Sequence, residues 1–426
     1  MNTIRGRAVV AAVGAVMLIA AACQSGPVGG TIRILATWTD AEEDIFLSIV
    51  EPWAEENDVT IEYEGTRDLS AVLTTQVEGG NPPDVAGLPG PGQMAQFAET
   101  GDLVDLTDII DLDAMAESYN EGWIADGMVG DQFVGIFIKV AAKGLIWYNP
   151  AQFGDAGYEV PSDWAGFEGL VDQIAADGTT PWGIGVESDA ASGWPATDWI
   201  EDFLLRQSGP EAYDQWWQGE LAWTSPEVRA AFEAFGAWAA DEAYVAGGPQ
   251  QVLSLNFGNG GDCLFADPAE CYLHHQASFI TGFFEDNFPG EAVAGETYDF
   301  FAMPGDAFDG LTTAGDLFGM FVDTPQSQSL MQYLVTPEAQ QIWVEAGGAI
   351  SPNADVPLDV YPDDTSRRIA EILNNAEVVR FDASDKMPAQ MNEAFWSATL
   401  DFIQNPGNLD QILSDLDAVQ AEAYEE

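Results

Sequence analysis

The feature that most constrains the fold is the alternation of short apolar runs with amphipathic segments near the start of the chain. Three runs have the length and composition of strands: TIRILATW (31–38), VTIEYEG (59–65) and PDVAGL (83–88). Two segments between them carry apolar residues at helical spacing: 41–57 and 69–80. This β-α-β-α-β order predicts a parallel sheet with helices on both faces. In such sheets ligands lie beyond the carboxyl ends of the strands. Those ends are here residues 38–40, 65–67 and 87–93.

The N-terminal segment has the composition of an export signal. Arg5 and Arg7 precede an apolar run that ends in three alanines and Cys23. A cysteine in this place resembles a bacterial lipoprotein processing site, which makes residues 1–22 the lipoprotein signal peptide and Cys23 the lipidated residue. An ordinary signal peptide cut at an Ala-x-Ala site is the alternative. Residues 23–30 then form a flexible tether.

About 400 residues follow the signal, which is too long for one core and suits two lobes. Two cysteines besides Cys23 remain, Cys263 and Cys271. Outside the cytoplasm a disulfide between them is favoured. Metal ligation with His274 or His275 is the alternative, but the spacing matches no zinc template. We expect neither a metal site nor a cofactor.

The charge balance excludes one class of partner. The chain has 12 basic and 71 acidic residues, a net charge of −59, yet 47% of its residues are hydrophobic. That apolar content is typical of a folded globular protein. Nucleic acid is excluded because binding its phosphates needs basic residues. The acids are spread along the chain, so we expect an acidic surface whose self-repulsion favours solubility.

Signatures of common enzymes are absent from the sequence. It has no Walker loop, no G-x-S-x-G elbow, no H-E-x-x-H and no Rossmann glycine fingerprint. A glycoside hydrolase needs only two suitably placed carboxylates. With 71 acidic residues such a pair stays open as an alternative.

Aromatic residues beside acids indicate a sugar-binding surface instead. Trp38, Trp182 and Trp194 lie in or near expected loops after strands. The apolar faces of sugar rings stack on aromatic rings, and sugar hydroxyls bond to carboxylates and amides. The alternative for each tryptophan is core packing.

The segment GWPATDWIEDFLLR (193–206) combines both kinds of residue. The spacing of Asp198 and Glu201 predicts a capping box, with Asp198 as N-cap. Glu201, Asp202 and Arg206 are then expected on the helix surface, with Asp202 and Arg206 as an i,i+4 pair.

Three long segments resemble the extracellular solute-binding proteins of ABC importers, in the large family that binds oligosaccharides. The first is GGNPPDVAGLPGPGQMAQFAETGDLVDLTD (79–108). The others are GLIWYNPAQFGDAGYEVPSDWAGFEGLVDQI (144–174) and YLVTPEAQQIWVEAGGAISPN (333–353). The resemblance implies an α/β, two-lobed type II binding-protein fold. Each lobe is a mainly parallel sheet flanked by helices, and the ligand lies in the interlobe cleft.

The same resemblance implies where the chain crosses between lobes. The expected crossings lie near residues 141–144, 296–299 and 351–354. The first lobe then comprises residues 31–141 and 299–351, and the second comprises residues 145–296 and 354–426.

Further segments are similar to the α-glucoside-binding branch: 179–206, 244–252, 271–284 and 380–388. The ligand implied is trehalose, maltose, sucrose or a similar disaccharide. Carried over position by position, the resemblance implies a set of ligand contacts. They are Trp38, Asp40, Gln93, Glu187, Trp194, Asp198, Phe279, Asp316, Arg380 and Trp396.

The sequence therefore predicts a monomeric, lipid-anchored binding protein on the outer face of the cell membrane. It would capture an α-glucoside by hinge closure and deliver it to permease subunits, with no bond made or broken. The alternatives are a secreted glycoside hydrolase and an adhesion or structural lipoprotein. A polyol or glycerol phosphate is an alternative ligand, and the scarcity of basic residues argues against the phosphorylated one.

Overall fold

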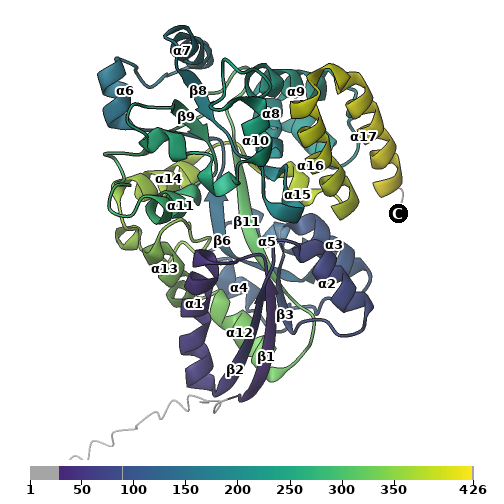
Figure 1. The fold of residues 1–426 in the computed structure, drawn as a ribbon. Coiled ribbons are helices and arrows are strands. Elements are labelled where there is room, and N and C mark those ends of the chain that lie inside the picture. Colours follow the sequence, from purple (N-terminus) through teal and green to yellow (C-terminus); the bar gives the residue numbers. More distant parts are fainter. Residues whose placement is uncertain (1–27, 89, 425–426) are drawn as a thin grey trace, which may run out of the picture.

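The computed structural model describes residues 28–88 and 90–424. The predicted signal peptide and Cys23 lie outside these residues, as does most of the tether. Figure 1 shows two lobes, with β6 (Gly135–Ala142) and β11 (Leu311–Met320) running between them. Among the described helices, none has the length and apolar character that a membrane span requires.

The first lobe contains a six-stranded mixed sheet. Its strand order is β12-β11-β3-β1-β2, and β6 pairs with β11 off this path. The remaining bounds are β1 (Gly30–Ala36), β2 (Val59–Gly65), β3 (Val85–Leu88) and β12 (Val379–Phe381). As predicted, β1 is parallel to both β2 and β3. β11 runs antiparallel to β3 and β6.

Helices cover both faces of this sheet because side chains alternate along each strand. In β1, Ile32 and Ile34 join the core formed with α1 (Ala41–Asn57), α12 (Pro325–Leu334) and α13 (Pro337–Ala346). Leu35 points the other way and joins the core formed with α2 (Leu69–Glu78) and α3 (Pro91–Glu99). The predicted two-sided burial is confirmed.

The second lobe is built on a four-stranded sheet of order β10-β7-β9-β8. Its strands are β7 (Leu145–Tyr148), β8 (Thr180–Gly183), β9 (Cys271–His275) and β10 (Asp299–Ala302). The helices packed around it include α7 (Trp164–Ala176), α8 (Trp194–Trp217), α9 (Pro226–Ala239), α10 (Gly248–Ser254), α16 (Ala389–Gln404) and α17 (Leu409–Ala423). A disulfide joins Cys263 and Cys271 beside β9.

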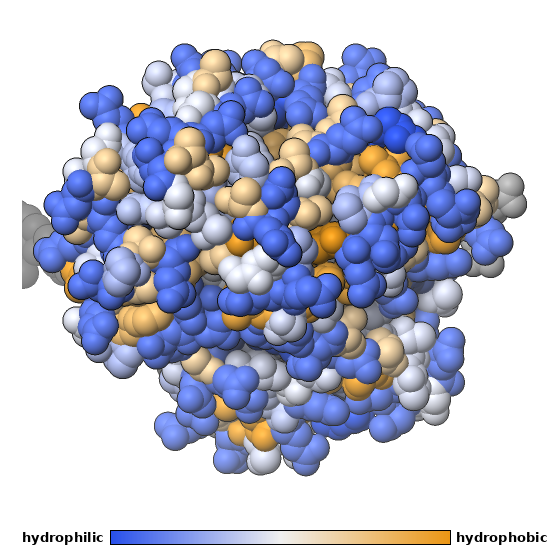
Figure 2. All heavy atoms as spheres, turned by 45° about the horizontal axis from the view of Figure 1, so that its top comes forward, coloured by the Kyte–Doolittle hydropathy of each residue, from blue (hydrophilic) through white to orange (hydrophobic). Residues whose placement is uncertain are grey.

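Shorter elements complete the chain. They are α4 (Leu112–Met115), α5 (Glu121–Asp126), β4 (Met128–Val129), β5 (Gln132–Phe133), α6 (Pro150–Ala156), α11 (Ile280–Asn287), α14 (Asp364–Asn375) and α15 (Ala383–Lys386). Figure 2 shows the molecule turned so that the top of Figure 1 comes forward. This face carries mostly hydrophilic residues, with apolar residues in small separate groups.

Strand pairing places two segments differently from the expected lobe boundaries. The strand β10 pairs with β7 in the second lobe, so the second crossing follows residue 302 instead of preceding residue 299. The strand β12 pairs with β11 of the first-lobe sheet, although residues 354–426 were assigned to the second lobe. Pairing partners far away in the chain set the lobe to which each strand belongs. The first crossing consists of Lys143 and Gly144, between β6 and β7.

Candidate functional site

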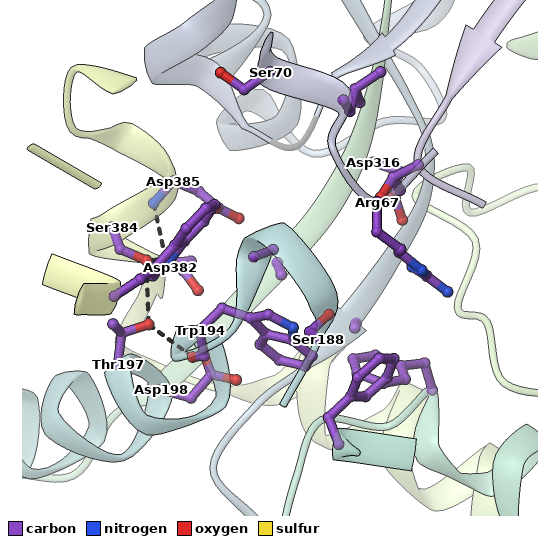
Figure 3. Close-up of a pocket in the computed structure, with 18 of the residues that line it drawn as sticks. Arg67, Ser70, Ser188, Trp194, Thr197, Asp198, Asp316, Asp382, Ser384 and Asp385 are labelled. Atoms are coloured by element: carbon purple, nitrogen blue, oxygen red, sulfur yellow. Dashed lines mark hydrogen bonds between the residues drawn. The ribbon is translucent and has the colours of Figure 1, made fainter. Parts of the chain in front are cut away.

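A cavity of about 490 Å³ lies between the two lobes. First-lobe residues reach it from the ends of β1 and β2, from β6 and from β11. Second-lobe residues reach it from the start of α8, from the loop before α11 and from α16. Figure 3 shows Arg67 and Asp316 of the first lobe and Trp194 and Asp198 of the second around one space. The position at strand ends agrees with the rule for parallel sheets.

Six of the ten predicted ligand contacts line this cavity: Trp38, Trp194, Asp198, Phe279, Asp316 and Trp396. Trp38 contributes little surface, because its ring is buried against Phe46, Phe318 and Trp343. For Trp38 the core-packing alternative describes most of the side chain.

The other four predicted contacts lie elsewhere within the described part of the chain. Asp40 is exposed before α1. Glu187 accepts hydrogen bonds from the side chain of Asn256 and from the backbone of Asp189. Arg380 forms a bidentate ion pair with Asp214. Gln93 lines a smaller neighbouring chamber. A segment can match a family in sequence while its side chain pairs with another residue of the protein outside the cavity.

One wall of the cavity is aromatic. The centroid of the Trp194 ring lies 5.1 Å from that of Phe257 and 5.9 Å from that of Phe279. The Phe257 and Phe279 centroids are 6.3 Å apart. The guanidinium carbon of Arg67, from the first lobe, lies 5.7 Å from the Phe257 ring centroid. This cation–π contact joins the lobes across the cavity.

Gly193 allows Trp194 to reach this wall. It precedes α8 with a φ of 111°, and a Cβ added there would lie 2.5 Å from the backbone oxygen of Trp396. Only glycine permits both this backbone conformation and so close an approach to α16. The start of α8 is therefore held against α16, with Trp194 and Trp396 both on the cavity lining.

The first-lobe wall carries alternating charges. Glu42 accepts from Arg67 at 2.9 Å and from Lys139 at 3.1 Å, and Lys139 also lies 3.6 Å from Asp316. Burial acts to raise the pKa of Glu42, but Lys139 and Arg67 outweigh it and lower that pKa. Burial raises the pKa of Asp316. Because each cation already has a carboxylate partner, this wall suits an uncharged ligand rich in hydroxyls.

The second-lobe wall is organised by a buried lysine. The ammonium of Lys143 lies 2.7 Å from Asp198 Oδ1 and also pairs with Asp382. Burial acts to lower the pKa of Lys143, but these carboxylates outweigh it and raise that pKa. Burial likewise acts to raise the pKa of Asp382, but Lys143 lowers it below its ordinary value. Asp198 Oδ2 is buried and has no hydrogen-bond partner within the described chain, so it can form a hydrogen bond with a ligand hydroxyl.

The start of α8 differs from the predicted capping box. The helix begins at Trp194, four residues before Asp198, so Asp198 lies inside it. Glu201 is buried and accepts hydrogen bonds from the backbone nitrogens of Ala383 and Ser384. It anchors the segment after β12 to α8 and is not a surface residue.

The predicted pair of Asp202 and Arg206 is present at 2.6 Å, but both side chains are buried. Asp202 also accepts from Thr312 and lies 2.6 Å from His275 Nε2. Burial acts to raise the pKa of Asp202, but Arg206 and His275 outweigh it and lower that pKa to about 2. The surface placement was wrong because α8 lies in the middle of the lobe, beneath Gly144 of the first crossing.

Several charged and aromatic residues of the site were not predicted, among them Glu42, Arg67, Lys139, Lys143, Phe257 and Asp382. The sequence did contain an indication that the three cationic residues belong to the site. Only 12 basic residues occur in the chain, and three of them line this cavity. In so acidic a protein, a lysine at a strand end or at a crossing is worth treating as a site candidate.

The pKa of Asp198 predicts a pH-dependent stability. Burial raises this pKa to about 8, even beside Lys143. The folded protein therefore keeps a proton that the unfolded chain loses near its ordinary pKa of 3.8. The stabilisation is fully present below that value and is lost as pH rises through about 8. Glu201 and Asp385, whose pKa values burial also raises, act in the same direction.

We expect denaturant titrations to show stability falling between pH 5 and pH 8, with a smaller slope in Asp198→Asn. The matched control is Asp382→Asn, on the other side of Lys143. The pKa of Asp382 is lowered, so this change should leave the slope in that window in place. Equal slopes in the wild type and Asp198→Asn would contradict the assignment.

Comparison with known proteins finds a matching family and several similar relatives. The profile of the family described as "Bacterial extracellular solute-binding protein" matches residues 39–341. The osmoprotective compounds-binding protein GgtB of Synechocystis sp. is 35% identical over 396 residues, covering 91% of this chain and 93% of that protein. The alpha-glucosides-binding periplasmic protein AglE of Rhizobium meliloti is 37% identical over 394 residues, covering 90% and 85%.

Solved structures share the fold at low sequence identity. A chitin oligosaccharide binding protein superposes with a TM-score of 0.80 at 18% identity, covering 93% of this chain and all of that one. Maltose-bound MalE3 of T. maritima superposes with a TM-score of 0.71 at 16% identity, covering 92% and 99%. The fold is therefore the two-lobed type II fold that the sequence predicted.

Proposed function

Because the chain belongs to the bacterial extracellular solute-binding proteins, which serve ABC importers, we propose that its ligand is a small α-glucoside. It captures this ligand outside the cytoplasm and delivers it to the permease. The family consists of binding proteins and not of enzymes. Trehalose, maltose and sucrose are the first candidate ligands, since AglE, a relative at 37% identity, is described as binding alpha-glucosides.

The observation that carries the proposal is the pairing of an aromatic wall with charge-compensated polar walls. Trp194, Phe257 and Phe279 present ring faces on which the C–H face of a pyranose stacks. Opposite charges within the polar walls leave carboxyl oxygens such as Asp198 Oδ2 to form hydrogen bonds with sugar hydroxyls. The volume of about 490 Å³ lies within the range of about 300–1,000 Å³ for small-molecule sites.

The charge pattern disfavours a phosphorylated ligand. Arg67, Lys139 and Lys143 are the cations of the lining, and each is already paired with a carboxylate. A phosphate would have to displace these carboxylates or lie beside them. A neutral sugar or polyol hydroxyl donates to them without that cost.

Closure follows from a ligand that touches both lobes. Trp194 and Asp198 belong to the second lobe, and Glu42 and Asp316 reach the same cavity from the first. A ligand that bonds to both sides favours the closed arrangement by its greater affinity for that state. The crossing at Lys143 and Gly144 lies at the edge of the site, so ligand contacts and hinge residues are neighbours.

A thermal-shift panel tests the proposed ligand class. We expect trehalose, maltose or sucrose to raise the melting temperature by several degrees. A ligand at 100 times its Kd stabilises the folded state by about 2.7 kcal/mol. Glycerol phosphate should give no shift. Failure of every sugar to shift the transition would contradict the proposal, and release of glucose from maltose during incubation would favour a glycoside hydrolase.

We also propose that the mature protein is a monomer anchored to the membrane through lipidated Cys23. The support is the signal-like segment ending in three alanines and cysteine. Membrane fractionation of cells expressing Cys23→Ala checks the anchor. Retention of the variant in the membrane fraction would count against it.

A further inference from the structure

A second, smaller chamber opens beside the main cavity. Its volume is about 20 Å³, which is room for one water-sized group. Four residues line both spaces: Ser70, Asp385, Glu393 and Trp396. The chamber is therefore a side extension of the proposed ligand site.

The chamber is lined from both lobes. Gln93 lies on α3 of the first lobe, whereas Asn392 and Trp396 lie on α16 of the second. The backbone near the start of α3 packs directly against the segment around α15. A Cβ at Gly92 would meet the backbone oxygen of Met387 at 2.0 Å. The lobes touch here, and the chamber is the space left between them.

Three polar atoms of the chamber residues are buried and have no partner within the described chain. They are Gln93 Oε1, Asn392 Oδ1 and Trp396 Nε1. Gln93 and Asn392 are only 6% and 8% exposed, and Gln93 Nε2 is already committed to Ser70 Oγ at 2.8 Å. Leaving buried polar atoms unpaired is destabilising, because they lose the hydrogen bonds that water makes to them in the unfolded chain. A chamber with three such residues in its lining is suited to a polar occupant.

The three atoms form a complementary set: two acceptors and one donor. A water molecule can donate two hydrogen bonds and accept one from an indole N–H, so its hydrogen-bonding capacity matches the three atoms. A ligand hydroxyl donates once and accepts once, so it satisfies two. A cation would face the indole N–H, and an anion would face two amide oxygens, so neither fits.

We infer that this chamber binds one hydroxylic oxygen, either a water or a hydroxyl of the sugar, and that this oxygen joins α3 to α16 when the lobes are closed. The inference rests on the proposed function, because it makes the chamber a part of the sugar site. The oxygen favours the closed arrangement by hydrogen-bonding to both lobes. Gln93, Asn392 and Trp396 then contribute to sugar binding by holding this oxygen between the two lobes.

The test is a double-mutant cycle read by isothermal titration with whichever of trehalose, maltose and sucrose the wild type binds. Asn392→Leu and Gln93→Met remove the acceptors at similar side-chain size. We expect each variant to bind the sugar about 2- to 10-fold more weakly, the effect of one hydrogen bond. Because both acceptors would share one oxygen, the double variant should lose less than the product of the two factors.

Gln152→Met is the matched control. Gln152 has the same pattern, with Nε2 donating to the Ala266 carbonyl at 2.8 Å and Oε1 buried without a partner among the described residues. Gln152 lines neither the main cavity nor the smaller chamber. Its sugar affinity should equal that of the wild type.

Crystal structures with and without the sugar identify the source of the oxygen. An ordered oxygen within about 3.2 Å of the three atoms supports the inference. Continuity with the sugar assigns it to the ligand, and isolation assigns it to water. A chamber without ordered oxygen, or strictly multiplicative losses in the cycle, overturns the inference. If no sugar binds to the wild type, the proposed function fails, and the sugar-free crystal still tests the chamber.

Discussion

Replacing Lys143 with methionine is expected to lower the free energy of unfolding by about 3–5 kcal/mol, the usual effect of removing one partner from a buried ion pair. The ammonium of Lys143 is buried between Asp198 and Asp382 at the crossing between the lobes. Methionine keeps most of the length of the side chain but leaves the buried carboxylate of Asp382 without its cation and Asp198 without its hydrogen-bond donor. Chemical denaturation at pH 7 measures the loss.

The pH dependence distinguishes charge from packing. In the wild type, Lys143 lowers the pKa of Asp382. The stability from that pair is present above the ordinary aspartate pKa of 3.8 and is lost as pH falls below it. The deficit of Lys143→Met should therefore be largest near neutral pH and shrink in acid. Adding Asp382→Asn to Lys143→Met should restore part of the stability, which a pure packing defect would not allow.

Lys386→Met is the matched control for Lys143→Met. Lys386 Nζ pairs with Asp126 at 2.7 Å, but the two side chains remain 19% and 21% exposed. Ion pairs accessible to water contribute only about 0.2–1 kcal/mol. The same substitution should therefore cost far less at residue 386. Equal losses at the two positions would contradict the role assigned to Lys143.

The second large effect is expected on ligand affinity, at Trp194. Trp194→Ala should weaken binding of the disaccharide found in the thermal-shift panel by about 30-fold or more. The indole forms the aromatic wall with Phe257 and Phe279, and losing about 80 Å² of apolar contact costs about 2 kcal/mol. That free energy corresponds to roughly 30-fold in Kd. Isothermal titration measures it, and Trp194→Phe should retain most of the affinity.

Trp217→Ala is the control for Trp194→Ala. Trp217 is also a partly buried tryptophan of α8, but it lies at the other end of the helix and outside the cavity lining among the described residues. Its removal should lower stability and leave the Kd within about twofold. An unchanged Kd in Trp194→Ala would mean that the ring serves only to pack Phe257 and Phe279.

The residues used in these predictions were not all predicted equally well from the sequence. Trp194 and Phe279 were predicted as sugar contacts and line the cavity, because each follows a strand or begins a helix at the edge where ligands collect. Asp198 also reaches the cavity, but as a buried partner of Lys143 and not as a helix cap. The dipeptide Trp194–Pro195 after Gly193 is a better start signal, since proline favours the first turn.

Other parts of the site could not be predicted from local patterns. Arg380 and Glu187 lie in segments that match the family, yet outside the cavity Arg380 pairs with Asp214 and Glu187 accepts from Asn256. Lys143 and Asp382 are 239 positions apart, and only the return of β12 to the first-lobe sheet brings them together. An ion pair of this kind leaves no periodicity in the sequence.

The sequence alone determined the order of the first three strands and two helices and the parallel pairing of β1 with β2 and β3, because the alternation of apolar residues is a local property of each segment. It also determined the edge at which the ligand site lies. The tertiary structure decided which lobe holds β10 and β12. It also showed that Glu201, Asp202 and Arg206, which were expected on the helix surface, are buried. The physical reason is that strand partners and charge partners are chosen by long-range packing, whereas capping and amphipathic patterns report only on the nearest turns of the chain.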